Sequence, residues 1–471
     1  MTGRTSPSLQ ALPRAVAITL GLGASLLGAA APPVLIPFST TGPTSARINL
    51  VLLAEGYQQS ERAKFEADGI AVINGILGAE PLATYRPFFN AYGIFVPSVD
   101  SGADHPLDRI QRNTYFNSTF NSYGTERVLT IPPNDIDPDW SHGDGRVYAL
   151  LADLMPEYDL AAVVVNDDEY GGSGGGVLVV STHWQSPEIA THELGHTFAH
   201  LGDEYPNAYP YPDVEEPNTT RETRRELLKW NPWVLDTTPL PTTTAFPSYQ
   251  SVVGLFEGAH YHASGWYRPQ FTCRMQRLGV PFCAVCSEAL VLAAHRIASP
   301  VESVSPDAGT PVLVSRPVRF TVGMIPPNAD TLAVEWRLND VPLAPVDPLS
   351  LELRASQLPT GSSTLTLEIS DLTPFVRSDP LGYTRHSVHW TVVRDSDAPP
   401  ELAVTAAAGG ALELSWPVGA EGFRLEEAGE LATEDGAWKP VVEPPVPGAD
   451  GRLHLMVIPG DGSRFFLLRK P

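Results

Sequence analysis

The stretch from His192 to Tyr205 reads HELGHTFAHLGDEY and contains the pattern His-Glu-x-x-His. Residues four positions apart lie on the same face of a helix, so His192 and His196 can bind one zinc ion together. Glu193 then lies beside that ion and can take a proton from a water molecule that the metal activates. The pattern therefore requires a helix here and indicates zinc-dependent hydrolysis of peptide bonds.

The residues on either side predict where this helix begins and ends. Ser186 is a typical N-cap, Pro187 suits the first helical position, and Glu188 suits the positive end of the helix dipole. Gly202 is expected to end the helix, because glycine readily takes the left-handed conformation that follows a last helical turn.

A third protein ligand has to come from chain that folds back on the helix. His200 continues the face of His192, but the two residues start about 12 Å apart at about 1.5 Å of rise per residue. Metal–nitrogen bonds are only about 2.1 Å long, so a straight helix cannot bring both residues to one ion. Asp203 directly follows Gly202 and is the first choice. Glu204, His200 and a more distant residue remain alternatives.

The chain is strongly acidic, with 54 acidic and 31 basic residues and a formal net charge of −23. Such a chain repels phosphate backbones and anionic membranes, which argues against nucleic-acid partners. Its 471 residues are enough for about three domains. The expected partners are protein or peptide substrates, and the oligomeric state is left open.

The first 31 residues have the features of a secretory signal peptide. Arg4 and Arg14 supply positive charge, residues 15–27 are apolar, and small residues follow at 28–31. A membrane anchor is the alternative, but the apolar run is shorter than the roughly 20 residues that a spanning helix needs. We therefore expect a protein that is secreted, periplasmic or at the cell surface, with no stable membrane insertion after cleavage.

Three cysteines lie close together in the sequence, at Cys273, Cys283 and Cys286. In an oxidising compartment, one disulfide and one remaining thiol are expected. A second metal site is the competing interpretation, but the sequence offers no evident fourth ligand. The pairing of the three residues is left open.

Residues 44–299 are predicted to form an α/β catalytic unit with a mixed sheet. Apolar runs at residues 48–54 and 160–166 suit buried strands, and residues 60–77 have the apolar spacing of a helix. Residues 177–181 suit a further strand, which could be a sheet edge that pairs with an extended substrate.

The remainder of the chain is predicted to be all β. Short β-type runs separated by proline and aspartate indicate an immunoglobulin-like sandwich at residues 300–396 and a C-terminal β module at residues 397–471. Both are expected to be small immunoglobulin- or fibronectin-like domains. The predicted strands are 312–314, 318–322, 332–338, 364–369 and 387–393 in the first, and 412–416, 422–425, 438–442, 453–458 and 464–468 in the second.

Several further stretches make the chain resemble metallopeptidase family sixty-four, the IgA peptidase family of bacterial zinc peptidases. The resemblance covers residues ~46–299 and implies a metzincin-like zinc peptidase domain with a mixed sheet and an active-site helix. The matching stretches are LLAEGY (52–57), PSVDSGADHP (97–106), NTYFNSTF (113–120), NDDEYGGSG (166–174), HELGHTFxxLxDEY (192–205), CRM (273–275) and FCAVC (282–286).

The resemblance implies roles for individual residues. His192, His196 and Asp203 would be the metal ligands of a zinc ion. Glu193 would be the general base, and Met275 would lie in the tight turn that sits beneath the metal in metzincins. Together these roles imply a secreted zinc-dependent endopeptidase that hydrolyses protein substrates.

The spacing departs from the standard metzincin pattern HExxHxxGxxH at its end. Ala199 stands where the glycine would be, and Gly202 stands where the third histidine would be. Asp203 follows one residue later, so the pattern does not fix the third ligand in this chain.

The oxyanion stabiliser and the overall function each have an alternative interpretation. Tyr261, His262 and Tyr267 are candidates for stabilising the oxyanion, or they are aromatic residues that pack beside the Met275 turn. The alternative function is a non-catalytic surface- or carbohydrate-binding protein with a vestigial peptidase domain. The intact zinc motif argues against that alternative.

Overall fold

The computed structural model describes most of the chain from residue 31 to residue 470. The expected signal peptide lies outside the described residues except for Ala31. In the described part of the chain, no helix is both long and apolar enough to cross a bilayer. The residues that are not described are 1–30, 133–142, 208–210, 360, 396–399, 419, 421, 431–437, 459, 461 and 471.

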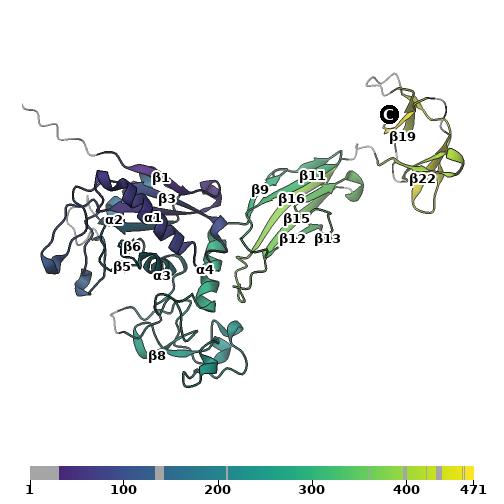
Figure 1. Cartoon of the computed structure of the whole chain (residues 1–471). Coiled ribbons are helices and arrows are strands. Elements are labelled where there is room, and N and C mark those ends of the chain that lie inside the picture. Colours follow the sequence, from purple (N-terminus) through teal and green to yellow (C-terminus); the bar gives the residue numbers. More distant parts are fainter. Residues whose placement is uncertain are drawn as a thin grey trace, which may run out of the picture.

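A six-stranded mixed sheet organises the first part of the chain (Figure 1). Its four central strands run parallel to one another, and an antiparallel strand lies at each edge. The mixed sheet expected from the sequence is therefore confirmed. In spatial order the strands are β1 (Val34–Ser39), β3 (Phe89–Phe95), β2 (Ile48–Glu55), β4 (Leu160–Val165), β6 (Leu178–Val180) and β5 (Gly172–Ser173).

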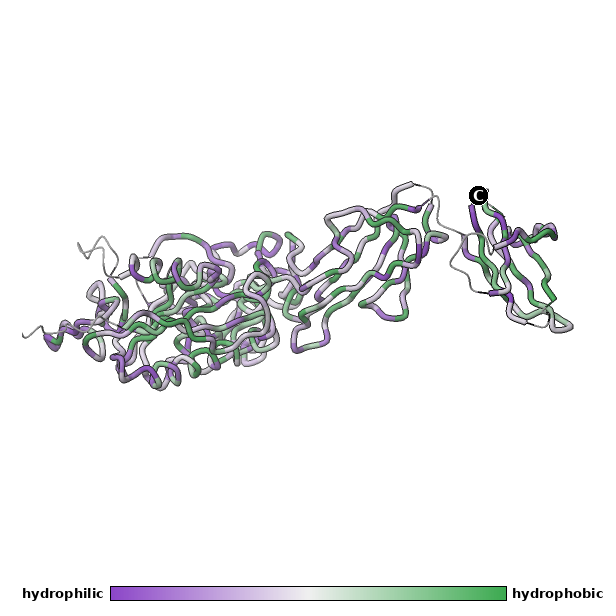
Figure 2. The backbone as a smooth tube through the Cα atoms, turned by 90° about the horizontal axis from the view of Figure 1, so that it is seen from above, coloured by the Kyte–Doolittle hydropathy of each residue, from purple (hydrophilic) through white to green (hydrophobic). Residues whose placement is uncertain are grey.

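Strand β2 shows that the sheet is covered on both faces. All of its residues are buried. Leu50 and Leu52 belong to one hydrophobic cluster, whereas Val51 and Leu53 belong to another. A strand covered on both sides needs a continuous apolar run rather than an alternating one, and this segment has such a run. Figure 2 shows the hydrophobic residues concentrated along the strands of this sheet.

Four α-helices of the described chain accompany this sheet, namely α1 (Arg62–Ile76), α2 (Gly143–Leu154), α3 (Ser186–Ala199) and α4 (Ala284–Ile297). Helices α1, α3 and α4 contribute to the larger hydrophobic cluster, and α2 contributes to the smaller one. Helix α3 contacts both α1 and α4, so it is held from two sides. A separate hairpin consists of β7 (Phe256–Ala259) and β8 (His262–Arg268).

Two segments in this region are a helix and a strand, as predicted. The helix starts at a different residue, and the strand has a different place in the sheet. The helix predicted at residues 60–77 is α1, which begins at Arg62 after a short 3-10 turn. The strand predicted at residues 177–181 is β6, which pairs with β4 on one side and β5 on the other. The expectation that this strand is a free sheet edge is therefore wrong.

Residues 301–394 form two β-sheets around a hydrophobic cluster of their own. Trp336 and Trp390 stack within it, with ring centroids 5.7 Å apart. The strands predicted at 312–314 and 332–338 have the predicted limits. One sheet contains β10 (Val312–Val314), β16 (Arg385–Arg394), β15 (Ser362–Asp371), β12 (Leu332–Leu338) and β13 (Val341–Leu343), and the other contains β14 (Ser350–Leu353), β11 (Val318–Met324) and β9 (Val301–Ser305).

Residues 403–469 form two smaller sheets around a further cluster, which includes Leu414, Trp416 and Leu455. Apart from one 3-10 turn, the regular structure in the described residues of this region is all β, as predicted. One sheet contains β17 (Ala403–Ala406), β18 (Leu412–Pro417), β22 (Arg452–Val457) and β21 (Val446–Pro447), and the other contains β20 (Lys439–Pro440), β19 (Arg424–Ala428) and β23 (Phe465–Arg469).

A buried polar contact joins α4 to the five-stranded sheet. The Asp371 carboxylate accepts a hydrogen bond from Tyr85 Oη at 2.5 Å and lies 2.9 Å from His295 Nε2. The side chains of His295 and Asp371 are fully buried. His386 approaches from β16, with its Nε2 3.3 Å from His295 Nδ1. Burial and the adjacent His295 lower the pKa of His386 to about 4, against the opposing charges of Asp371 and Asp379.

Replacement of His386 by glutamine is predicted to reduce the loss of folding stability as the pH falls below neutral. A histidine in the unfolded chain takes up its proton near a pKa of about 6.5, whereas folded His386 has a pKa of about 4. As pH falls between these values, the unfolded state binds a proton that the folded state does not, so wild-type stability decreases. Chemical denaturation across this pH range should show a smaller decrease for His386→Gln.

The matched control for this prediction is His389→Gln, because His389 is exposed on the same strand. The control should lose stability as steeply as the wild type. Equal slopes for the wild type and His386→Gln would show that this histidine does not contribute to the acid sensitivity.

Candidate metal centre

Helix α3 carries two histidines whose rings converge. His192 Nε2 and His196 Nε2 lie 3.3 Å apart. The other ring nitrogen of His192, Nδ1, donates to the Arg274 carbonyl at 2.9 Å. His196 Nδ1 likewise donates to the Leu201 carbonyl at 2.6 Å. A histidine that donates through Nδ1 leaves its Nε2 lone pair available, so both rings are held in the form that a metal ligand needs.

The helix begins one residue earlier than its sequence signals suggest. Ser186 is the first helical residue, and Gln185 before it makes no side-chain capping hydrogen bond. Pro187 and Glu188 lie in the first turn, as expected. The prediction of Ser186 as the N-cap is therefore wrong by one position.

The chain reverses direction directly after the helix. The last helical residue is Ala199, and His200 takes the left-handed conformation with φ of 53°. The His200 N–H donates to the His196 carbonyl at 3.1 Å, and the Leu201 N–H bonds back into the same last turn at 3.0 Å. The prediction that Gly202 ends the helix is therefore wrong, because the reversal occurs at His200.

This reversal returns Asp203 to the two histidines. Its Oδ1 lies 3.1 Å from His192 Nε2 and 3.5 Å from His196 Nε2. Ligands bonded at about 2.1 Å to one tetrahedral ion are about 3.4 Å apart, so these distances fit a shared metal. The same buried oxygen accepts no hydrogen bond from the described residues. A buried carboxylate oxygen without a donor, beside two imidazole lone pairs, fits a divalent metal ion.

The other two candidates for the third ligand have different surroundings. His200 is exposed. Glu204 is fully buried, but its Oε1 lies 3.3 Å from Cys286 Sγ. Of the three alternatives, Asp203 is the one that the structure brings to the histidine pair.

Two tyrosines hold the second oxygen of Asp203. Tyr205 Oη donates to Oδ2 at 2.8 Å and Tyr261 Oη donates to it at 2.5 Å. Burial and the Asp203 charge raise the pKa of both phenols, so both remain protonated and can donate. Tyr261 is thus placed on a carboxylate rather than at an open oxyanion position. The role of Tyr205 as a donor to Asp203 was not predicted from the sequence, although Tyr205 is the last residue of the DEY stretch of the motif.

The remaining aromatic candidates for oxyanion stabilisation have other partners. His262 Nδ1 donates to the His260 carbonyl at 2.5 Å. Tyr267 pairs through its backbone with Thr220. The structure therefore brings Tyr261, but not these two residues, to the Asp203 carboxylate.

Glu193 lies on α3 beside the first histidine. Burial raises the pKa of its carboxyl group. A Cβ on Gly174 would lie only 2.7 Å from Glu193 Oε2 and 3.2 Å from His196 Cβ. The glycine-rich loop therefore passes directly against these side chains, and a larger residue at position 174 would collide with them.

Met275 packs against the backbone of the motif. A Cβ on Gly195 would lie 2.7 Å from Met275 Sδ, and the methionine is fully buried. The Met275 carbonyl also accepts a hydrogen bond from the Glu204 N–H at 2.8 Å. This turn therefore contacts both the helix that carries the histidines and the loop that carries Asp203.

Asn218 holds the returning loop and was not identified from the sequence. Its side-chain oxygen accepts from the Gly202 N–H at 2.7 Å, and its amide group donates to the Gly202 carbonyl at 2.8 Å. The same amide group donates to Glu204 Oε1 at 2.9 Å. Asn218 lies in an irregular segment, which gives no local pattern from which this role could be recognised.

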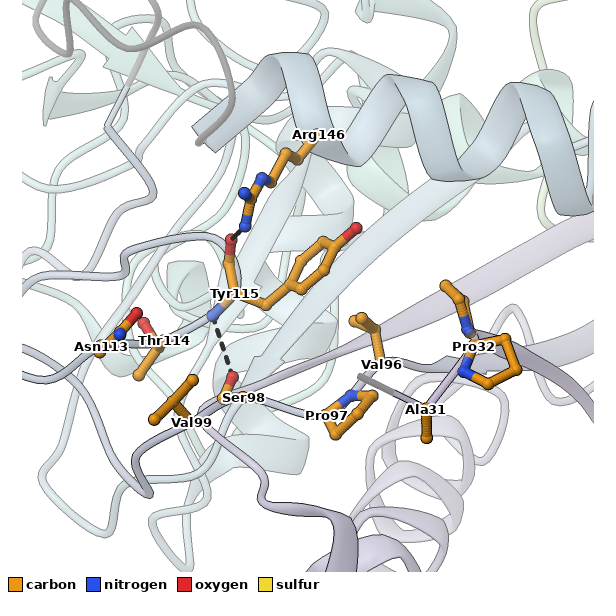
Figure 3. A pocket seen from close by; sticks show the side chains of 11 residues that line it. Ala31, Pro32, Val96, Pro97, Ser98, Val99, Asn113, Thr114, Tyr115 and Arg146 are labelled. Carbon is orange, nitrogen blue, oxygen red and sulfur yellow. Dashed lines mark hydrogen bonds between the residues drawn. The ribbon is translucent and has the colours of Figure 1, made fainter. Parts of the chain in front are cut away.

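A cavity of about 440 Å³ lies in another part of the molecule (Figure 3). Its lining includes Pro32, Ser98 and Arg146, whose guanidinium donates to the Tyr115 carbonyl at 2.7 Å. The metal-centre residues are not part of this lining. The cavity is therefore separate from the candidate metal centre.

Comparison with known proteins agrees with the motifs. The model of the IgA peptidase M64 family matches residues 36–248 and 243–293, which is more than half of the chain. No curated protein matches. A solved chain from a cytokine receptor complex is 16% identical to this chain. The match covers 35% of this chain and 87% of the solved chain, and its TM-score of 0.11 is too low to indicate a shared fold. On the family match, this chain belongs to the IgA peptidase M64 family.

Proposed function

We propose that this member of a metallopeptidase family is a secreted, zinc-dependent endopeptidase that acts on protein substrates. The observation that carries the proposal is the convergence of His192 Nε2, His196 Nε2 and Asp203 Oδ1 within 3.5 Å of one another. Three protein ligands of these types, with one position left for water or substrate, are characteristic of catalytic zinc sites.

The chemistry follows from what each residue can do. A bound zinc ion supplies Lewis acidity, which activates water and polarises the scissile carbonyl. His192, His196 and Asp203 would hold the ion. Glu193, next to His192 on α3, would act as the general base, which accepts a proton from water and passes it to the leaving amine.

The hydrogen bonds to Asp203 orient this ligand. With Oδ2 held by Tyr205 and Tyr261, Oδ1 is the oxygen that faces the histidines. Neutral phenol donors also stabilise the carboxylate as an anion, which is the form that binds a metal. The two tyrosines are therefore positioning residues for the third ligand.

We extend the proposal to the whole chain as predicted from its sequence. The signal peptide at residues 1–31 rests on the sequence features alone. A metzincin-like catalytic domain at 44–299 is supported by the packing of Met275 against α3. An immunoglobulin-like domain at 300–396 and a C-terminal β module at 397–471 are supported by their own hydrophobic clusters.

The non-catalytic alternative, a surface- or carbohydrate-binding protein with a vestigial peptidase domain, is not favoured. A domain that had lost its peptidase activity would not need to keep three metal-binding side chains together. Here His192, His196 and Asp203 still converge, and Glu193 accompanies them.

Replacement of Glu193 by glutamine is predicted to abolish most peptidase activity without removing the metal. Loss of a general base lowers the rate by about 100-fold to 10,000-fold, and the three metal ligands are unchanged. Casein cleavage and metal content by mass spectrometry measure the two properties separately. Glu66→Gln, on the outer side of α1, is the matched control and should behave as wild type. Wild-type cleavage by Glu193→Gln would refute its role as the base.

Replacement of Tyr261 by phenylalanine is predicted to weaken zinc binding by about 10-fold to 100-fold, because the hydrogen bond that orients Asp203 is lost. The double variant with Tyr205→Phe should bind zinc more weakly still. Competition with a chromogenic chelator measures the affinity. Tyr249→Phe is the control, because Tyr249 lies in the 3-10 turn at 247–249 and its ring packs against Phe246. Unchanged affinity in the double variant would show that the phenols do not support the ligand.

A further inference from the structure

Four buried side chains from three separate segments converge beside the metal centre. Cys273 Sγ lies 3.6 Å from Cys286 Sγ. Glu204 Oε1 lies 3.3 Å from Cys286 Sγ and 3.9 Å from Cys283 Sγ. One ligand atom from each of the four lies within 4.8 Å of every other, and all four residues are buried. Glu204 is therefore the candidate for the fourth ligand, which the spacing of the cysteines in the sequence does not reveal.

These distances correspond to the edges of a tetrahedron around one ion. With zinc–sulfur bonds of about 2.3 Å and a zinc–oxygen bond of about 2.0 Å, sulfurs are about 3.8 Å apart and sulfur and oxygen about 3.5 Å apart. Three of the six distances between the ligand atoms, at 3.3, 3.6 and 3.9 Å, scatter around these values, and all six lie within 4.8 Å. Thiolates select zinc among the common divalent ions, and the harder carboxylate oxygen disfavours monovalent copper.

We propose that Cys273, Cys283, Cys286 and Glu204 bind a second zinc ion, which has a structural role. All four positions of the tetrahedron are filled by protein atoms, as in structural rather than catalytic zinc sites. This site is distinct from the one at His192, His196 and Asp203, and its existence does not depend on the proposed peptidase mechanism.

Backbone donors already support the sulfur atoms. The Cys283 N–H donates to Cys273 Sγ at 3.2 Å, and the Cys286 N–H donates to Cys283 Sγ at 3.4 Å. Cys283 is the N-cap of α4, so its sulfur lies at the positive end of the helix dipole. Hydrogen bonds of this kind stabilise thiolates in the shell around a metal.

The charges around the cluster also favour a divalent cation. Three thiolates and the Glu204 carboxylate would carry four negative charges in a buried space. Arg268 and Arg274 are largely buried and interact electrostatically with Cys273. Arg274 also pairs with Glu188 at 3.3 Å, so the two guanidinium groups offset only part of that charge, and a divalent cation would offset two more of the negative charges.

A disulfide explains fewer of the observations. A bond between Cys273 and Cys286 would use two of the four groups and leave the Cys283 thiol beside a buried carboxylate. Glu204 Oε2 accepts no hydrogen bond within the described part of the chain. Although Oε1 accepts from Asn218, a buried carboxylate charge with one oxygen lacking a donor is costly, and a divalent cation bound by all four groups would offset that charge.

The location of the site indicates what the second ion does. Glu204 directly follows Asp203, and its N–H donates to the Met275 carbonyl at 2.8 Å. The ion would therefore tie the loop that carries Asp203 to the turn at 273–275 and to the start of α4. By holding Glu204, the ion would also restrict the position of the adjacent Asp203, the proposed third ligand of the catalytic zinc.

Metal content of the full chain, purified under reducing conditions, tests the proposal. Wild type should contain about two zinc ions per chain, and Cys286→Ser and His196→Ala should each contain about one. His196→Ala is the matched control, because it disrupts the histidine site and leaves all four ligands of the second site. A single zinc in wild type that persists in Cys286→Ser would overturn the proposal.

Cobalt substitution identifies which site is filled and does not depend on the folding of a cysteine variant. Cobalt-loaded His196→Ala should retain an intense thiolate-to-cobalt charge-transfer band in the near ultraviolet, even if the proposed catalytic site is lost. Thiol titration of unfolded, unreduced wild type should detect three free cysteines after metal removal. Absence of the band would overturn the second metal site, and detection of a single free thiol would establish the disulfide.

Discussion

The convergence of His192, His196 and Asp203 depends on the reversal of the chain at His200. The helix alone can supply two ligands, because a third one on the same face would lie about 12 Å from the first. A residue other than glycine in the left-handed conformation costs roughly 1 kcal/mol, and His200 adopts it with φ of 53°. Hydrogen bonds from the His200 and Leu201 N–H groups into the last turn offset that cost. The reversal then delivers Asp203 to the histidines.

After the same reversal, the adjacent residues Asp203 and Glu204 lie in different environments. Asp203 faces two imidazoles and two phenols, whereas Glu204 faces the cysteine cluster. Asn218 and the Met275 carbonyl hold the backbone between these environments. Since both acids belong to one short loop, the position of Asp203 is coupled to the packing of the cysteine cluster.

Local features could be predicted from the sequence, and features that depend on distant segments could not. The spacing of the two histidines and the need for chain that turns back are local, so the convergence of Asp203 with the two histidines could be expected. The reversal was placed at Gly202 on conformational preference, but hydrogen bonding fixed it at His200. Asn218 comes from an irregular segment and gave no signal. Strand β3 was missed because Asn90 interrupts its apolar pattern, although that side chain is satisfied by buried hydrogen bonds.

Anomalous diffraction from crystals of the zinc-loaded protein, measured at the zinc absorption edge, tests the central claim most directly. We predict a peak about 2.1 Å from Nε2 of His192, Nε2 of His196 and Oδ1 of Asp203. A peak between the histidines whose third protein ligand is His200 or Glu204 would contradict the role assigned to the chain reversal. Absence of any peak between the histidines would contradict the metal centre itself.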